Sequence, residues 1–380
     1  MEARVRKIFL VGHYGGANTG DDAMLYGCLS ELRRFGLDVT VVSKSTGGAL
    51  FQKLGTNPVK PKFFSVIKAI NSADWVVLGG GTHYHDDYKL FRLLRHIRYL
   101  TVLTSVFVFS KLVGKRIALI SMGFGPFRTK VVRLLFKIVL RIADFIAVRD
   151  NRSLAEVQCR GMKAKVLYAF DLSACLLNEL KLDKLEAEGV ENVPVLGISP
   201  TKLHLGEKLV GCDSNTFWSI LAKEVEKVVK PKGIKVHLFE FRGGRRESDG
   251  ELVSLMEREL GVAGVKVEKI SYQQDPLTML RYVQRCHWFV ASRFHSSVFA
   301  YLAQVPQIII PYHQKLVDFA FDIGLEVGMV PLERPGWPEV FRNKLLSMIS
   351  EPERFTARVP ITWACESAKQ NFEFLEMSIR

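Results

Sequence analysis

The sequence predicts an α/β protein built from two Rossmann-like, doubly wound domains that face a central cleft. Three observations predict this fold class. The chain has 380 residues. This length exceeds what a single hydrophobic core usually organises. Short Val- and Ile-rich runs alternate with longer amphipathic runs, which is typical of parallel strands covered by helices. This alternation stops at a polar segment, residues 178–193, and then begins again, so we expect two successive sheets.

The first domain is predicted over residues 1–178. Its strands are short runs that end in Gly or a polar residue: KIFLVG (7–12), VTVVS (39–43), DWVVLGG (74–80), RIALISMG (116–123), DFIAVRD (144–150) and KVLYAFD (165–171). Helical stretches separate them, notably 21–35 and 131–142. The apolar run 99–113 is shorter than the roughly 20 residues of a membrane-spanning helix, so we interpret it as a buried helix.

Residues 179–193 are the predicted linker, and residues 194–358 are the predicted second domain. Its strands are VPVLGISP (193–200), IKVHLFEF (234–241), VKVEKI (265–270), HWFVAS (287–292) and QIIIPY (307–312). Its helices are expected near 214–229, 248–260, 276–285 and 296–303. Residues 359–380 are predicted to form a C-terminal helix. In two such domains ligands bind at the carboxyl ends of the strands.

The composition is that of a globular protein, with 48% hydrophobic and 24% charged residues, and it excludes disordered and collagen-like chains. The net charge of +14 arises in the first half, because residues 1–180 hold 27 basic and 13 acidic side chains and residues 181–380 hold 26 of each. A basic half indicates an anionic partner. Aromatic residues are not interleaved with the bases as in single-strand binders, so we expect no nucleic acid.

Two basic helix faces in this half favour an anionic membrane surface. They consist of Lys89, Arg92, Arg95 and Arg98 at three-residue spacing, and of Arg133, Lys137 and Arg141 at four-residue spacing. Each set lines one side of its helix. The N-terminus resembles no signal peptide. We therefore expect a cytoplasmic protein that is peripheral at the inner face of the membrane, and the alternative is an ordinary solvated face.

Candidate chemical groups follow the strands of the first half. Asp21 and Asp22 open a helix, where they complement its dipole and repel a phosphate. They either cap that helix or accept a hydrogen bond from a sugar hydroxyl as a general base. Gly79, Gly80 and Gly81 follow another strand, where the lack of side chains lets backbone amides approach a ligand.

A metal site is the less favoured interpretation of the next loop. His83, His85, Asp86 and Asp87 resemble a ligand cluster, but alternate residues of a loop rarely converge on one ion. We expect no metal and a solvated polar loop.

Arg149 lies at the end of the predicted strand DFIAVRD (144–150). It either forms a structural ion pair with Asp150 or binds a carboxylate or phosphate in the cleft, which suits the planar guanidinium. Asp171, at the end of the next strand, suits a helix cap.

The strongest candidate site follows the strand HWFVAS in the second half. Arg293 and His295 lie at the start of a predicted helix, and Lys315 follows the next strand. A guanidinium and an imidazole at a helix N-terminus form an anion site with a proton donor. Three cationic groups at two adjacent strand ends favour a functional role over a structural one.

Six segments in register resemble the polysaccharide pyruvyl transferase family over residues 7 to about 325. They are GHYGGANTGDDAML (12–25), LGGGT (78–82), SMGFGPF (121–127), AVRDNRS (147–153), SRFHSSVFAYLAQVP (292–306) and YHQKLVDFAFDIGL (312–325). Each segment alone is weak, and the six together are specific. The chain departs from the family pattern at Phe294, where Leu is more usual, and at Ser296, which replaces a small apolar residue. It also departs at AFDLS (169–173), which stands in place of the Asp-Pro-containing segment of the family.

The resemblance implies a GT-B-like transferase that moves the enolpyruvyl unit of phosphoenolpyruvate onto two hydroxyls of a sugar, forming a pyruvate ketal and phosphate. The acceptor would be a cell-wall, capsule or exopolysaccharide precursor, free or lipid-linked. Ketal formation needs an acid for the methylene carbon and a base for the sugar proton. The catalytic candidates are His295, Arg293, Asp21 and Asp22. The substrate-binding candidates are Asn18, Gly20, Gly79, Gly80, Gly81, Thr82, Arg149, Asp150, Ser296 and Lys315. No cofactor is required besides the co-substrate phosphoenolpyruvate.

A glycosyltransferase of the same architecture is the alternative. In that case Arg293, His295 and Lys315 would hold the diphosphate of a nucleotide sugar, and Glu240 would hold its ribose. An inactive relative that acts as a scaffold is a further alternative, and the retained Arg-x-His argues against it.

Overall fold

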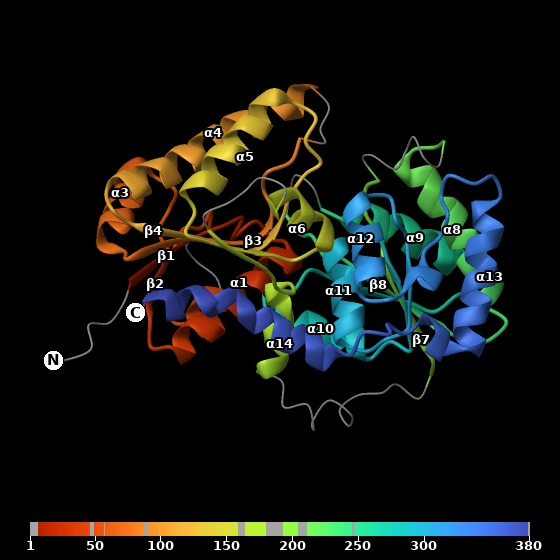
Figure 1. Ribbon diagram of the computed structural model, residues 1–380. Helices are drawn as coiled ribbons and strands as arrows, with labels where there is room; N and C mark the ends of the chain where they lie inside the picture. The colour runs from red at the N-terminus through yellow and green to blue at the C-terminus, as the bar shows by residue number, and fades with distance from the viewer. Residues whose placement is uncertain are drawn as a thin grey trace. The chain divides into compact units, whose positions relative to one another are not determined.

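The computed structural model describes residues 7–45, 49–56, 58–86, 90–158, 164–179, 193–203, 211–244 and 248–378. The chain divides into two compact units (Figure 1). The first consists of Met1–Gly16, Asp21–Leu176 and Thr362–Arg380, and the second of Ala17–Gly20 and Leu177–Ile361. Most of the predicted linker 179–193 lies outside the described residues.

The first unit contains a six-stranded parallel sheet with the strand order β2-β1-β3-β4-β5-β6. Its strands are β1 (Lys7–Val11), β2 (Asp38–Val41), β3 (Trp75–Thr82), β4 (Arg116–Gly123), β5 (Phe145–Val148) and β6 (Lys165–Tyr168). All six coincide with apolar runs of the sequence. The sheet grows in opposite directions from β1 and β3, and such a reversal favours a ligand site at the carboxyl ends of these two strands.

The helices that connect these strands are α1 (Thr19–Arg34), α2 (Ala49–Lys53), α3 (Phe63–Ser72), α4 (Leu90–Leu112), α5 (Lys130–Ile142) and α6 (Asn151–Gln158), and the 3-10 helix η1 (Leu172–Asn178) follows β6. Val76 and Ile146 point to one face of the sheet and share a core with α3 to α6. Trp75 and Phe145 point to the other face, where both contact Phe374, with ring centroids 4.9 and 5.8 Å apart. The alternation reflects strands buried on both faces. Figure 1 shows α3, α4 and α5 together on one side of the sheet.

The interpretation of residues 99–113 as a buried helix is wrong for one of its faces. This run forms the second half of α4, whose Leu100, Leu103 and Phe107 are buried. Val102 on the opposite face is 59% exposed. Burial follows the helical period and the position of the sheet, which mean hydropathy does not report.

The second unit contains a five-stranded parallel sheet with the order β11-β10-β7-β8-β9. Its strands are β7 (Val195–Ser199), β8 (Lys235–Phe239), β9 (Val267–Ile270), β10 (Trp288–Ala291) and β11 (Gln307–Ile309). The sheet grows outward in both directions from β7 and β10, so the carboxyl ends of these strands are the preferred ligand position in this unit.

The helices of this unit are α8 (Ser214–Val229), α9 (Gly250–Val262), α10 (Pro276–Gln284), α11 (Phe294–Leu302), α12 (Gln314–Asp322) and α13 (Trp337–Ser350), with the 3-10 helices η3 (Glu326–Gly328) and η4 (Pro352–Phe355). Asp213 caps α8 by accepting hydrogen bonds from the backbone N–H groups of Asn215 and Thr216 at 2.8 and 3.0 Å, which satisfies donors that a helix start leaves unpaired. Phe217 of α8 stacks on Trp337 of α13 at 4.6 Å within the core of the unit.

The C-terminal segment belongs to the first unit. It forms α14 (Ile361–Lys369) and η5 (Gln370–Ser378). Asn371 is fully buried, accepts a hydrogen bond from the backbone N–H of Ser121 at 2.6 Å and donates one to the Phe170 carbonyl at 2.9 Å. The Ser367 hydroxyl accepts from the Phe170 N–H at 3.0 Å. These bonds fasten the end of the chain to β4 and to the residues after β6.

Candidate active site

Hydroxyl groups connect β7 and β10 where the second sheet reverses its direction of growth. Ser199 Oγ lies 2.6 Å from Ser296 Oγ, and the Ser292 hydroxyl donates to the Ser199 carbonyl. Ser296 Oγ also accepts from the Arg293 backbone N–H at 3.1 Å. Ser296 is fully buried, so its hydroxyl positions the start of α11, which was not anticipated for a substrate-binding candidate.

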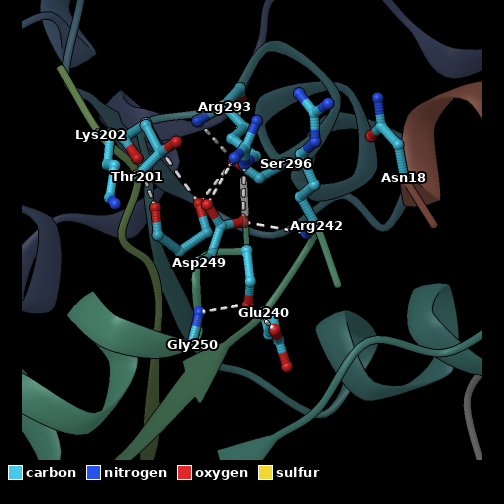
Figure 2. A network of polar contacts seen from close by, with 12 residues as sticks. Asn18, Thr201, Lys202, Glu240, Arg242, Asp249, Gly250, Arg293 and Ser296 are labelled. Atoms are coloured by element: carbon cyan, nitrogen blue, oxygen red, sulfur yellow. Dashed lines mark hydrogen bonds and ion pairs between the residues drawn. The ribbon is translucent and has the colours of Figure 1, made fainter. Parts of the chain in front are cut away.

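Arg293 forms a bidentate ion pair with Asp249 (Figure 2). The Nε–Asp249 Oδ2 distance is 2.7 Å and the Nη2–Asp249 Oδ1 distance is 2.5 Å. Asp249 precedes α9, is 1% exposed, and accepts another hydrogen bond from the Arg242 backbone N–H at 2.9 Å. Figure 2 shows the Arg242 side chain extending alongside Arg293. A guanidinium that donates two hydrogen bonds to one carboxylate, as that of Arg293 does to Asp249, is held in one orientation.

His295 lies in the first turn of α11 against Gly20. Residues 17–20 belong to the second unit, because the Thr19 N–H donates to the Phe241 carbonyl at 2.9 Å and the Gly243 N–H donates to the Ala17 carbonyl at 3.0 Å. A Cβ atom at Gly20 would overlap the His295 imidazole. The glycine therefore makes room for the imidazole, which explains why a glycine precedes the two aspartates.

We expect Gly20→Ala to lower activity although alanine favours a helix by about 1 kcal/mol over glycine. The added methyl group must displace the His295 ring. The melting temperature and the turnover rate should therefore move independently, with turnover falling at least tenfold. Gly261→Ala is the matched control, because a Cβ atom there meets nothing within 4 Å. Unchanged turnover in Gly20→Ala would contradict this role of the glycine.

Further cationic and polar groups surround the same strand ends. Lys315 Nζ of α12 lies 6.0 Å from the centroid of the Phe294 ring, and Lys202 after β7 pairs with Glu251 at 2.8 Å. Burial raises the pKa of Tyr312, with the charge of Asp249 acting in the same direction and the charges of Arg293 and Arg242 opposing it. The phenol therefore remains a hydrogen-bond donor at neutral pH. Neither Tyr312 nor Arg242 was predicted from the sequence.

The helix starts add to this positive potential. α11 and α12 begin directly after β10 and β11, and helix N-termini attract anions. Together with Arg242, Arg293, Lys315 and His295, they form an electropositive cluster in which the buried Asp249 holds one of the guanidinium groups. The cluster can bind a small phosphorylated anion and hold an acid beside it.

Glu240, the ribose candidate of the alternative interpretation, is engaged in loop contacts. The Ser248 hydroxyl donates to one of its oxygens, and the Tyr272 N–H approaches the other at 3.5 Å. These contacts connect the end of β8 with the segments before α9 and after β9.

The triple glycine of the first unit contributes backbone geometry. Gly80 and Gly81 have φ angles of 72° and 96°, a region that side chains disfavour. The Tyr14 hydroxyl donates to the Gly79 carbonyl at 2.6 Å, and a Cβ atom at Gly80 would collide with Met24. Close packing of Tyr14 against Gly79 and of Met24 against Gly80 accounts for these two glycines, and the contact of the triple glycine with a ligand stays a prediction.

Arg149 pairs with Asp171, not with Asp150 as the structural interpretation expected. The Nη1–Asp171 Oδ2 distance is 2.7 Å, and the two side chains are 5% and 2% exposed. Arg149 Nη2 also donates to the Thr82 hydroxyl at 3.1 Å. Asp150 caps α6 by accepting from the Ser153 N–H at 2.7 Å. Arg149 thus orients Thr82 at the end of β3.

Asp21 and Asp22 lie in the first turn of α1, as predicted. Asp22 is 3% exposed and Asp21 is half-buried. The charge of Asp21 contributes to raising the pKa of His83 and of Tyr14, although burial has the larger effect on both and lowers the pKa of His83. The Asp21 carboxylate is therefore electrostatically coupled to the ring groups beyond β1 and β3.

These ring groups form a cluster that the sequence did not reveal. His83 Nε2 lies 2.9 Å from the Gly80 carbonyl, which only accepts, so Nε2 carries the proton and Nδ1 accepts from the Tyr99 hydroxyl at 2.8 Å. His13 packs edge-on against His83 with ring centroids 4.5 Å apart. Burial, then the neighbouring His13, lowers the pKa of His83 to about 3. His83 is consequently neutral at physiological pH.

In the loop after this cluster, a carboxylate is bonded to the backbone before α5. Asp86 is 1% exposed and accepts hydrogen bonds from the backbone N–H groups of Arg128 and Thr129. Asp87 lies outside the described residues. Among the residues that the structure describes, no group of three or more His, Cys, Asp or Glu is arranged to hold a metal ion.

Solved structures with the same fold cover nearly the whole chain. The Methanocaldococcus jannaschii UDP-GlcNAc 2-epimerase has a TM-score of 0.65 at 9% identity and covers 98% of this chain and 100% of that one. The S. aureus MnaA–UDP co-structure has a TM-score of 0.63 at 10% identity, with 98% and 95% covered. Anabaena Alr3699/HepE in complex with UDP and glucose gives 0.56 at 13% identity, with 98% and 97% covered. No curated protein matches the sequence significantly.

The two parallel sheets and these neighbours define a two-domain, Rossmann-like protein of the GT-B type, which confirms the predicted fold class. The family model of polysaccharide pyruvyl transferases matches residues 18–314. The chain therefore belongs to the polysaccharide pyruvyl transferase family and is of the transferase class. None of the helices in the described ranges is long and apolar enough to cross a membrane.

Proposed function

We propose that this protein transfers the enolpyruvyl unit of phosphoenolpyruvate to two hydroxyls of a sugar and thereby forms a pyruvate ketal. The observation that carries the proposal is the first turn of α11, where Arg293 is fixed by Asp249 and His295 is accommodated by Gly20. A small anion with a carboxylate and a phosphate suits the electropositive cluster around this turn.

In the proposed reaction His295 donates a proton to the methylene carbon of phosphoenolpyruvate. The neighbouring carbon becomes oxocarbenium-like and forms a bond to the first sugar oxygen, whose proton passes to a carboxylate base. The carbon–oxygen bond to phosphate then breaks, and the departing phosphate takes the proton from the carboxylate. The second sugar hydroxyl adds to the same carbon, and its proton returns to His295. The products are one ketal and one inorganic phosphate. Arg293 and Lys315 stabilise the departing phosphate.

We assign the base to Asp21, because it is half-buried whereas Asp22 is buried in the first turn of α1. The backbone of Asp21 directly follows Gly20, which contacts His295. A carboxylate near the N-terminus of a helix is held in its ionised form, as a general base requires.

The acceptor is proposed to be a cell-wall, capsule or exopolysaccharide precursor, in free or lipid-linked form. Residues 1–180 contain 27 basic and 13 acidic side chains. This positive net charge supports attraction to an anionic phosphate or membrane surface. This electrostatic attraction would place the protein peripherally at the inner face of the membrane and would weaken with salt.

A nucleotide-sugar reaction is the second candidate. The observation in its favour is that solved neighbours include a co-structure with UDP and a complex with UDP and glucose, by their titles. The same electropositive cluster would then hold a diphosphate.

Direct binding and product assays separate the two candidates. Calorimetric titration with phosphoenolpyruvate, UDP and UDP-GlcNAc should show saturable binding of phosphoenolpyruvate only. Incubation with phosphoenolpyruvate and a panel of methyl glycosides of hexoses and N-acetylhexosamines should release phosphate in step with ketal formation. Binding of UDP together with release of UDP from the nucleotide sugar would instead establish the second candidate.

A further inference from the structure

Residues 88–143 contain twelve Lys and Arg residues and no Asp or Glu, although the whole chain has 39 acidic residues. This segment includes α4, β4 and α5. A long basic stretch without a single acid is not compensated by ion pairs within its own helices. The segment therefore carries a large excess of positive charge, of which Lys111 is paired with Asp144, just beyond the segment, at 2.6 Å.

The bases of this segment gather on the outer side of two neighbouring helices. α4 and α5 contact each other and cover the same face of the first sheet (Figure 1). Apart from Lys111 at the end of α4, which pairs with Asp144 at 2.6 Å, their exposed bases are Arg92, Arg95 and Arg98 on α4 and Lys130, Arg133, Lys137 and Arg141 on α5. The basic residues that the sequence predicted on one side of each helix are thus exposed to solvent on both helices. Lys89 lies outside the described residues.

Large apolar side chains are exposed on the same two helices. Besides Val102 and Leu112 further along α4, five such side chains are exposed: Leu90, Phe91 and Leu94 on α4, by 73%, 83% and 60%, and Val131 and Leu134 on α5, by 49% and 56%. All five lie in the first two turns. Because each helix follows a strand of one parallel sheet, α4 and α5 start at the same edge of that sheet. We call these five apolar residues and the seven bases above the α4–α5 face.

We propose that the α4–α5 face docks on an anionic lipid bilayer, with Phe91, Leu94 and Leu134 inserted among the acyl chains and the bases at the phosphate headgroups. Aromatic and aliphatic side chains beside Lys and Arg are typical of surfaces that lie in the membrane interface. Long basic side chains can reach the headgroups while their stems remain in apolar surroundings. Each base near an anionic surface strengthens the attraction roughly fivefold.

The charge of the face argues against the other occupants. A second copy of the chain would bring two acid-free basic faces together, which like-charge repulsion disfavours. A nucleic acid would match the charge, but nucleic-acid bases stack on planar side chains. Leu90, Leu94 and Leu134 are not planar and would be left without a suitable partner. An anionic bilayer is complementary both to the bases and to the apolar residues.

Two pairs of substitutions measure the contributions separately. In co-sedimentation with phosphatidylglycerol–phosphatidylcholine vesicles, Phe91→Ser with Leu94→Ser should lower the partition coefficient at least tenfold. Arg95→Glu with Lys137→Glu should lower it by a further large factor and reduce its salt dependence. The matched controls are Val262→Ser, which is 87% exposed on α9, and Lys223→Glu with Lys232→Glu, exposed bases of the second unit. Both controls should bind as the unmodified protein does.

Insertion is distinguished from surface contact by fluorescence. Phe91→Trp should gain quenching by brominated lipid relative to the unmodified protein, and Val262→Trp should not. Absence of binding to anionic vesicles, equal binding to pure phosphatidylcholine, or unaltered binding of the Phe91→Ser, Leu94→Ser protein would each overturn the proposal. A dimer that these two substitutions dissociate would show that the face binds a second copy instead. Vesicle binding needs no donor, so its outcome is independent of the outcome for phosphoenolpyruvate transfer.

Discussion

His295→Ala is expected to lower turnover on the order of 100- to 10,000-fold, the usual contribution of a general acid. The imidazole lies in the first turn of α11, against Gly20, and its removal deletes the proposed donor of the proton to phosphoenolpyruvate. Steady-state rates with saturating phosphoenolpyruvate measure the effect. The affinity for phosphoenolpyruvate should change far less than the rate.

His295→Gln is the companion variant, since it keeps a hydrogen-bonding amide of similar size but transfers no proton at neutral pH. Both variants should melt close to the unmodified protein, because the side chain is half-buried. A rate within threefold of normal in either variant would remove His295 from the catalytic machinery.

Arg293→Ala is expected to destabilise the second unit by about 3–5 kcal/mol, because it leaves the buried Asp249 carboxylate without its guanidinium partner. The same substitution should abolish phosphoenolpyruvate binding. Thermal or urea unfolding measures the first effect, and calorimetric titration of the folded variant at low temperature measures the second. Arg354→Ala is the matched control, because its pair with Glu351 is exposed and such pairs contribute about 0–1 kcal/mol.

A double substitution separates the structural role of Arg293 from its role in binding. Arg293→Met with Asp249→Leu replaces a buried ion pair by apolar side chains, an exchange that is often neutral or stabilising. The double variant should therefore recover stability without recovering phosphoenolpyruvate binding. Recovery of both properties would show that the guanidinium serves the fold alone.

The sheets were predictable because parallel strands buried on both faces leave a strong local pattern. Nine of the eleven strands fall within apolar runs seen in the sequence, β8 inside IKVHLFEF and β10 inside HWFVAS for example, and β2 and β3 extend one or two residues beyond theirs. Which face of a helix is buried was harder to predict from the sequence, as the exposed Val102 and Phe91 of α4 illustrate. Which side of an apolar helix meets the sheet depends on neighbours that are distant in the sequence.

The candidate site was predictable in its strand-end residues and not in their partners. Arg293 and His295 follow a strand and open a helix, which local pattern reveals. Asp249 lies 44 residues away from Arg293 in the chain, in a loop with no distinguishing pattern. The pairing of Arg149 with Asp171 instead of Asp150 has the same origin, because adjacent strand ends bring together residues that sequence proximity does not.

The most direct test of the proposed reaction is to measure the deuterium content of the ketal that forms in D2O from phosphoenolpyruvate and an accepted methyl glycoside. If an acid protonates the methylene carbon, the methyl group of the ketal carries one deuterium from solvent, and one phosphate is released for each ketal. We predict this product from the unmodified protein and, in the same time, at least about 100-fold less of it from His295→Gln. A product without deuterium, or transfer from a nucleotide sugar with no use of phosphoenolpyruvate, would contradict the proposed reaction.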